Sequence, residues 1–176
     1  KLQYMLKQRD AFEFELKSIA NTDNLTGVLN RLALDDYLKI ADQQPQHYQQ
    51  LCLIIVDIDN FKQVNDRYGH IFGDQVIVSV AQCLKNNVRG SDLIVRFGGD
   101  EFLFMAPLSQ ERSAASYVEE IKREIREFNC HSDLNYELDA SIGYHIIKPE
   151  DKIDMEAAIK IADSKMYEEK KKKKCR

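Results

Sequence analysis

Hydrophobic residues follow two kinds of pattern along the 176 residues of the chain. Apolar runs predict strands at 51–56, near 92–97 and 101–107, and near 136–148. Apolar positions spaced by three and four predict helices at 32–41, around 76–84, around 117–128 and at 154–170. The run at 51–56 is apolar at every position, which is typical of a strand buried on both faces. By itself the pattern predicts one domain of mixed α and β structure.

The first 22 residues form a separate segment in this pattern. Positions at heptad spacing are apolar apart from one arginine: Leu2, Met5, Arg9, Phe12, Leu16 and Ile19. The spacing predicts a helix at 1–22, either in a short parallel coiled coil or folded back on its own domain. The segment begins in mid-helix without a start signal, so we expect a longer protein whose N-terminal part senses a signal. Residues 23–176 are expected to form the globular domain.

Composition narrows the class of protein. Hydrophobic residues make up 44% of the chain and charged residues 31%, as in ordinary globular domains. The net charge of −4 argues against a broad basic surface for nucleic acid. The four cysteines are scattered without a Cys-x-x-Cys pair, which favours a reducing cytoplasm and disfavours a zinc site. We therefore expect a cytoplasmic domain, in a full-length protein that is either free or membrane-anchored.

Two adjacent glycines predict a hairpin at 98–99. They lie between the apolar runs 93–95 and 102–105, and a tight reversal needs positive φ values that glycine adopts most easily. The hairpin is expected to hold Asp100 and Glu101 at its tip. Two carboxylates on a rigid turn suit a divalent cation better than a hydrophobic core.

A second pair of carboxylates, Asp57 and Asp59, follows the apolar run at 51–56. A sheet fixes the position of a side chain at the end of such a strand and exposes it at the sheet edge. If this strand lies beside the hairpin, Asp57 and Asp100 share a Mg²⁺ site made of hard oxygen ligands. The alternative is two unrelated acidic turns in solvent.

Several motifs match one family in the same order. Arg96-Phe97-Gly98-Gly99-Asp100-Glu101-Phe102 resembles the signature of the GGDEF domain, the diguanylate cyclase family. The resemblance covers the chain from about Asp23 onward, in the segments 23–31 (with Val28 where leucine is usual), 57–66, 69–74, 141–143 and 162–167. It implies an α+β fold with a central, largely antiparallel sheet flanked by helices, related to the palm of nucleotide cyclases and polymerases.

The resemblance also implies an activity, namely the condensation of two GTP molecules into cyclic di-GMP with release of two pyrophosphates. Each domain of this family holds one GTP, so the expected active form is a homodimer in which two domains face each other. The 3′-hydroxyl group on one side attacks the α-phosphate on the other, with Mg²⁺ or Mn²⁺ as cofactor. No nucleic acid partner is expected.

The resemblance assigns roles to the acidic residues. The metal ligands are Asp57, the backbone carbonyl of Ile58 and Asp100, with Glu101 as a further carboxylate at or behind the metal. Asp100 is also the expected proton acceptor, alone or together with a metal-held hydroxide. Lys62 is expected to stabilise phosphate charge in the transition state, although a lone lysine is more often simply solvated.

Base selection is assigned to a second group of residues. Asn65 and Asp74 match the guanine-binding positions of the family, and His70 lies beside them as a substrate contact. The Asp74 carboxylate can accept hydrogen bonds from the N1–H and the exocyclic amine of guanine, whereas adenine offers no such pair of donors. Without the motifs, Asp74 is better interpreted as a helix N-cap and His70 as a structural residue.

An arginine and an aspartate stand just upstream of the hairpin. Arg89-Gly90-Ser91-Asp92 resembles the product-inhibition site of the family. Arginine can grip phosphates or stack on guanine, and aspartate can accept hydrogen bonds from the guanine edge. A surface salt bridge is the alternative interpretation.

The C-terminus departs from the family pattern. Lys170 aligns with a phosphate-binding lysine, and Lys174 falls where arginine is usual, which keeps the charge but loses the bidentate fork. Lys173 replaces a glycine and Glu169 replaces an alanine. We expect Lys171 to Lys173 to form a solvated basic tail.

Three functions are compatible with these residues. An active diguanylate cyclase is favoured because every catalytic and guanine-binding position is filled. A non-catalytic module that binds GTP or cyclic di-GMP as a signal is the alternative, although such modules usually have a damaged hairpin signature. A cyclase with relaxed base choice is disfavoured by Asp74.

Overall fold

The computed structural model describes residues 18–41, 50–90, 92–109, 112–132, 136–148, 150–151 and 154–174. The elements are α2 (Arg31–Ala41), β1 (Leu51–Ile58), α3 (Phe61–Tyr68), α4 (His70–Lys85), β2 (Leu93–Arg96), β3 (Glu101–Pro107), α5 (Ala114–His131), β4 (Ala140–Ile147) and α6 (Met155–Lys174). Most of the helix predicted at 1–22 lies outside the described residues; its last part, residues 18–20, is helical.

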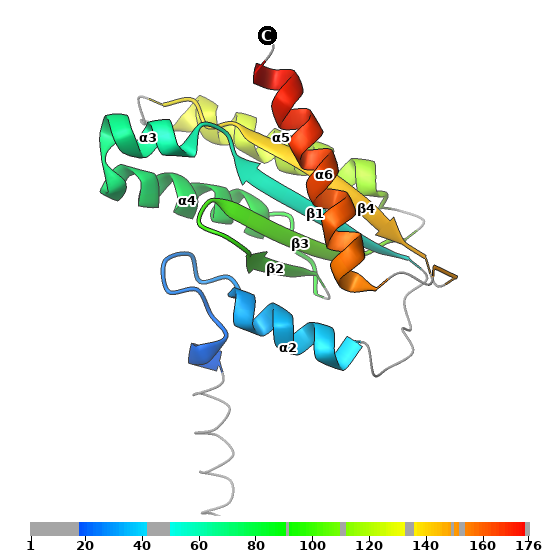
Figure 1. The fold of residues 1–176 in the computed structure, drawn as a ribbon. Coiled ribbons are helices and arrows are strands. Elements are labelled where there is room, and N and C mark those ends of the chain that lie inside the picture. The colour runs from blue at the N-terminus through cyan, green and yellow to red at the C-terminus, as the bar shows by residue number, and fades with distance from the viewer. Residues whose placement is uncertain are drawn as a thin grey trace, which may run out of the picture.

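The strands form one sheet in the order β2-β3-β1-β4, and every neighbouring pair is antiparallel. Helices α4 and α5 cover one face, α6 crosses the other face, and α2 lies beyond β2 (Figure 1). The prediction of an α+β fold with a central antiparallel sheet flanked by helices is therefore confirmed.

The central strand β1 contributes to two hydrophobic cores. All eight of its residues are buried, and successive side chains point to opposite faces of the sheet. Cys52, Ile54 and Val56 belong to the core beneath α4 and α5. Leu53 and Ile55 belong to the core beneath α2 and α6. The fully apolar sequence of β1 is thus explained by burial on both faces, as predicted.

Two element boundaries and one helix differ from the sequence prediction. The strand expected near 136–148 begins only at Ala140, and the last helix continues to Lys174. Helix α3 was not predicted, because its sequence FKQVNDRY is short and mostly polar, and only Val64 in it is buried. The polar helix instead presents several of the candidate functional residues.

The hairpin between β2 and β3 is confirmed, but for a different reason from the one expected. Neither Gly98 nor Gly99 has a positive φ. The amide groups of Phe97 and Gly98 donate to the Glu101 carbonyl at 2.8 and 3.2 Å. A Cβ atom at position 98 would lie 2.7 Å from the Glu101 carboxylate. A larger residue at 98 would therefore require the Glu101 carboxylate to move.

No helix among the described residues has the length and the apolar character needed to cross a membrane.

Candidate active site

The end of β1 brings the predicted acidic residues together. In the sheet register Asp57 faces Glu101 on β3 and Ser141 on β4. The amide of Ile58 donates to the Asp100 carbonyl at 3.1 Å. Asp57 is only 5% exposed. The sheet therefore places the strand end and the hairpin tip side by side, as the sequence predicted.

Burial and neighbouring negative charge raise the pKa values of two of these carboxylates, Asp57 and Glu101. Burial raises the pKa of Asp57, and the charges of Asp100 and Asp59 add to this effect, which outweighs the ion pair with Lys170. Burial also raises the pKa of Glu101, again with contributions from Asp57 and Asp100. The cluster thus holds more negative charge than its protein surroundings neutralise.

The donor chemistry of this cluster fits Mg²⁺. Among the described residues, no three His, Cys, Asp or Glu side chains converge closely enough to chelate an ion by themselves. Magnesium, however, is usually held by one or two carboxylates, with substrate phosphates and water completing its shell. Asp57, Asp100 and the Ile58 carbonyl offer hard oxygens of this kind, and the excess negative charge favours a cation.

Helix α6 supplies a lysine to the same cluster. Lys170 Nζ donates to Asp57 Oδ1. Burial lowers the pKa of Lys170, but the hydrogen bond and charge of Asp57, with Asp100 and Asp59, raise it overall, so the ammonium form is retained. Lys174 is exposed one helical turn further along α6. Both predicted phosphate contacts therefore lie on the helix that approaches the carboxylates.

A second lysine of α6, Lys173, makes a contact that the sequence did not predict. Lys173 Nζ donates to Asp59 Oδ2 and Asp139 Oδ1, each at 2.8 Å. The second oxygen of Asp59 accepts from Ser141 Oγ at 2.7 Å. The expectation of a solvated tail was wrong for Lys173, because Asp59 is buried and needs a counter-charge. The available signal was the spacing, since residues three apart share a helix face and Lys170 faces the carboxylates.

Helices α3 and α4 carry the predicted substrate contacts. They meet at Gly69, whose φ of 86° and ψ of 164° mark a sharp change of direction. His70 opens α4, and Asp74 follows one turn later on the same face, both exposed. The N-cap interpretation of Asp74 is wrong, because the cap position is Gly69 and Asp74 lies within the helix. Lys62 is exposed on α3.

Asn65 packs against α4 with an unpaired oxygen. Its Oδ1 atom is buried, and no donor among the described residues reaches it. A Cβ atom on Gly73 would lie 2.0 Å from that oxygen, so glycine at 73 leaves room for the Asn65 side chain in this position. A buried amide oxygen without a partner costs free energy, and a ligand with a donor group can recover it.

The Arg89–Asp92 turn lies apart from this cluster. The Asp92 carboxylate accepts from the Arg89 amide at 2.9 Å and lies 3.7 Å from the guanidinium of buried Arg112. Tyr117 OH approaches it at 3.4 Å. Burial raises the pKa of Asp92 despite these partners. The ion-pair partner of Asp92 is therefore Arg112 rather than Arg89, whose side chain is exposed; no sequence pattern singled out Arg112.

Arg96, which belongs to the signature motif but was assigned no role from the sequence, holds the hairpin tip. Arg96 donates through Nε and Nη2 to the Gly99 carbonyl at 3.2 and 2.7 Å. Its Nη1 contacts both Asp23 carboxylate oxygens at 3.2 Å. Burial alone would raise the pKa of Asp23, but hydrogen bonds from Thr26 and Arg96 lower it overall. Arg96 therefore ties the tip that carries Asp100 to the loop before α2.

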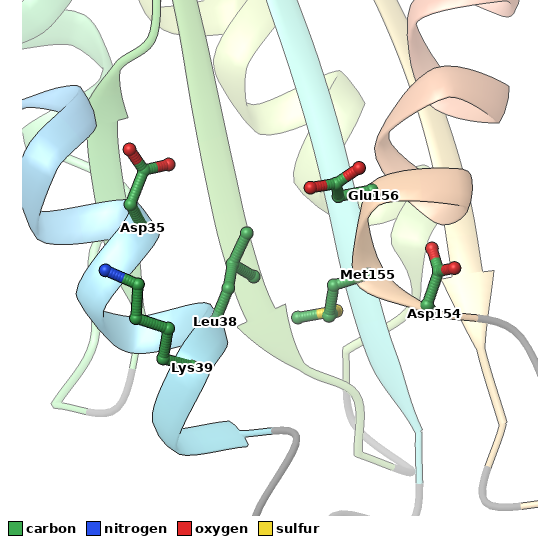
Figure 2. A pocket seen from close by; sticks show the side chains of 6 residues that line it. All are labelled: Asp35, Leu38, Lys39, Asp154, Met155 and Glu156. Atoms are coloured by element: carbon green, nitrogen blue, oxygen red, sulfur yellow. The ribbon is translucent and has the colours of Figure 1, made fainter.

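A hollow of about 550 Å³ between α2 and the start of α6 is separate from the site. Figure 2 shows the side chains that line it: Asp35, Leu38, Lys39, Asp154, Met155 and Glu156. From Met155 to Lys170 a helix rises by about 22 Å, so the hollow and the carboxylates lie at opposite ends of α6. None of the predicted site residues lines this hollow.

Comparison with known proteins identifies the family. Residues 20–176 match the family model for the diguanylate cyclase GGDEF domain, so the chain belongs to the GGDEF family. It is 36% identical over 154 residues to the diguanylate cyclase DgcP of Escherichia coli, covering 86% of this chain and 45% of that protein. It is also 36% identical over 154 residues to the bifunctional diguanylate cyclase/cyclic di-GMP phosphodiesterase MucR of Pseudomonas aeruginosa, covering 87% and 22%.

A solved structure supports the same family membership. The coiled coil and GGDEF domain of DgcB from Caulobacter crescentus, in complex with cyclic di-GMP, superposes with a TM-score of 0.79 at 26% identity. The alignment covers 97% of this chain and 90% of that one. The present chain, however, spans less than half the length of DgcP and MucR.

Proposed function

We propose that this domain is a diguanylate cyclase that condenses two GTP molecules into cyclic di-GMP and releases two pyrophosphates. The observation that carries the proposal is the cluster of Asp57, Asp100 and Glu101 at one end of the sheet, with raised pKa values of Asp57 and Glu101 and with Lys170 beside it. Relatives named as diguanylate cyclases and the cyclic di-GMP complex of DgcB support the same reaction.

Each residue has a role in this proposal. Asp57, the Ile58 carbonyl, Asp100 and Glu101 hold Mg²⁺ or Mn²⁺, which when bound neutralises phosphate charge and orients the triphosphate. The 3′-oxygen of one GTP forms a bond to the α-phosphorus of the other, its proton passes to the Asp100 carboxylate, and pyrophosphate leaves. The 3′-oxygen of the second GTP then bonds to the α-phosphorus of the first in the same way, which releases the second pyrophosphate and closes the ring.

Lysines and the α3–α4 pair complete the substrate site in the proposal. Lys62, Lys170 and Lys174 bind the phosphates, whose negative charge grows on the leaving group. The unpaired Asn65 oxygen and the Asp74 carboxylate accept hydrogen bonds from guanine, with His70 beside them. The exposed position of Asp74 and the buried, unpartnered oxygen of Asn65 support these roles.

The proposal extends to regulation. A homodimer supplies the second GTP. An N-terminal sensor, acting in the cytoplasm through the helix that precedes the domain, sets the geometry of this dimer.

Product binds at Arg89, whose exposed side chain can bind phosphate, and at Asp92. Arg89→Ala should therefore raise the cyclic di-GMP concentration that halves the rate by at least about tenfold, with little change in initial rate. The control is Arg126→Ala on α5, and an unchanged inhibition curve would remove Arg89 from the site.

The direct test is incubation of the purified domain with Mg²⁺ and GTP, or with GTP and ATP mixed, at several protein concentrations. Products are identified by mass spectrometry. Cyclic di-GMP formed with steeper than linear dependence on protein concentration supports a dimeric cyclase. Adenine-containing dinucleotides would indicate relaxed base choice. Binding of GTP or cyclic di-GMP without turnover, even after fusion of a dimeric coiled coil ahead of Leu2, would indicate a non-catalytic module.

A further inference from the structure

The ammonium group of Lys173 has an unusually complete set of protein partners. It donates to Asp59 Oδ2, Asp139 Oδ1 and the Ala140 carbonyl, each at 2.8 Å. A lysine ammonium has three N–H donors and no acceptor, so these contacts use all of them. Lys173 therefore differs from Lys170, for which the described residues show a single acceptor, on Asp57.

Asp59 depends on this contact. The residue is 7% exposed, and burying a carboxylate is costly unless it is paired and hydrogen-bonded. Ser141 donates to one of its oxygens, but among the described residues only Lys173 brings a positive charge within ion-pair distance. The charges of Asp59 and Asp139 raise the pKa of Lys173 although burial acts in the opposite direction. Lys173 thus keeps its positive charge beside the Asp59 carboxylate.

Asp59 occupies the turn that joins β1 to α3. Its amide donates to the Asp139 carbonyl at 3.0 Å, and its carbonyl accepts from Tyr136 OH at 3.2 Å. The next residue, Asn60, has a left-handed φ of 57° and begins the change of direction into α3. Asp57 and the Ile58 carbonyl precede this turn directly. Because they are joined to Asp59 along the backbone, a shift of Asp59 is expected to displace both Asp57 and the Ile58 carbonyl.

We propose that Lys173 is a positioning residue, which holds Asp59 and thereby fixes the turn that presents Asp57 and the Ile58 carbonyl. It acts from α6 across to the end of β1 without touching the substrate, because its donors are already occupied. Glycine, which is usual at this place in the family pattern, cannot make the contact because it has no side chain. The inference deepens the proposed cyclase function, on which its kinetic consequence rests.

The first test is kinetic. Lys173→Met keeps the apolar stem and removes the charge. Because loss of a residue that orients a metal ligand typically costs about 10- to 100-fold, we expect a fall of that size in kcat with KM for GTP changed less than about twofold. Lys173→Arg, which retains charge and donors, should restore most of kcat. The matched control is Lys172→Met, an exposed lysine on the same helix.

A raised KM with unchanged kcat would overturn the inference, because it would mean that Lys173 binds the triphosphate directly. Wild-type rates in Lys173→Met would overturn it as well. A loss of rate that Lys173→Arg fails to restore would point to helix packing rather than the charge.

The second test is independent of activity. In metal-free protein, amide hydrogen exchange at Asp59 and Asn60 should become about tenfold faster in Lys173→Met than in wild type, since a charged hydrogen bond no longer opposes local opening. Exchange in Lys173→Arg and Lys172→Met should match wild type. Unchanged exchange would overturn the inference. If wild-type protein makes no cyclic di-GMP, the proposed function fails, and the exchange measurement still decides the role of Lys173.

Discussion

At the scale of single residues, the site concentrates like charges. Asp57 and Glu101 face each other in adjacent strands, and the pKa of each is raised by burial and by the negative charge of neighbouring carboxylates. Directly opposed like charges destabilise a sheet. The arrangement thus lowers stability at the proposed binding site for a cation and phosphates.

Replacement of one of these carboxylates should make the metal-free protein more stable. Glu101→Gln keeps the shape of the side chain and removes its repulsion with Asp57 and Asp100. We expect Tm to rise, by about 2–4 °C for each kcal/mol of repulsion relieved in a domain of this size. Thermal unfolding in the presence of a chelator measures this. Glu119→Gln, on the exposed side of α5, is the control, and a lower Tm for Glu101→Gln would contradict the argument.

Removal of Asp100 should separate catalysis from folding. Its backbone carbonyl accepts from the Ile58 amide, a contact that alanine preserves. Asp100→Ala should therefore leave the circular dichroism spectrum unchanged. Its rate of cyclic di-GMP synthesis should fall by about 10²–10⁴-fold, the usual contribution of a proton acceptor, or further through loss of a metal ligand. Turnover at the wild-type rate would remove Asp100 from both roles.

At the scale of elements, the connection between α3 and α4 orients the proposed guanine contacts. Gly69 combines a φ of 86° with a ψ of 164°, a region that is essentially restricted to glycine. A Cβ atom there would meet nothing within 4 Å, so the requirement is conformational rather than steric.

The substitution Gly69→Ala should therefore strain or shift the junction. We expect a loss of about 1–3 kcal/mol in the free energy of unfolding, and a higher KM for GTP because His70 and Asp74 move relative to Asn65. Urea unfolding and steady-state kinetics measure the two effects. Gly90→Ala is the matched control, since Gly90 also has open space but no positive φ. Equal behaviour of the two variants would contradict the prediction.

The same elements show what the sequence could predict. The apolar run of β1 and the hairpin were visible because burial leaves a direct hydrophobic pattern. Helix α3 was not, because only Val64 is buried in it. The motifs located Asp57 and Asp100 correctly at one sheet end, whereas Lys173 was misjudged. The three-residue spacing from Lys170 could place Lys173 on the same helix face. It could not identify the partner, because Asp59 lies 114 residues away in the sequence.

At the scale of the whole molecule, the domain offers half of what the proposed reaction needs. The described part of one chain holds one carboxylate cluster and one set of proposed guanine contacts, at Asn65 and Asp74, whereas cyclic di-GMP contains two guanines. The two nucleotides must each donate a 3′-hydroxyl and present an α-phosphate. A symmetric pair of chains meets this requirement with each chain serving one nucleotide.

A mixing experiment tests this division of the site. Asp100→Ala chains should pair with wild-type chains and form dimers in which one half lacks its proton acceptor. If chains exchange freely, an equal mixture leaves about half of the wild-type chains in mixed dimers, so synthesis per wild-type chain should fall by about half. A larger excess of the variant should reduce it further. In the control mixture, chains with the single substitution Glu119→Gln replace the Asp100→Ala chains. Wild-type activity that is indifferent to added Asp100→Ala would mean that each chain completes the reaction alone.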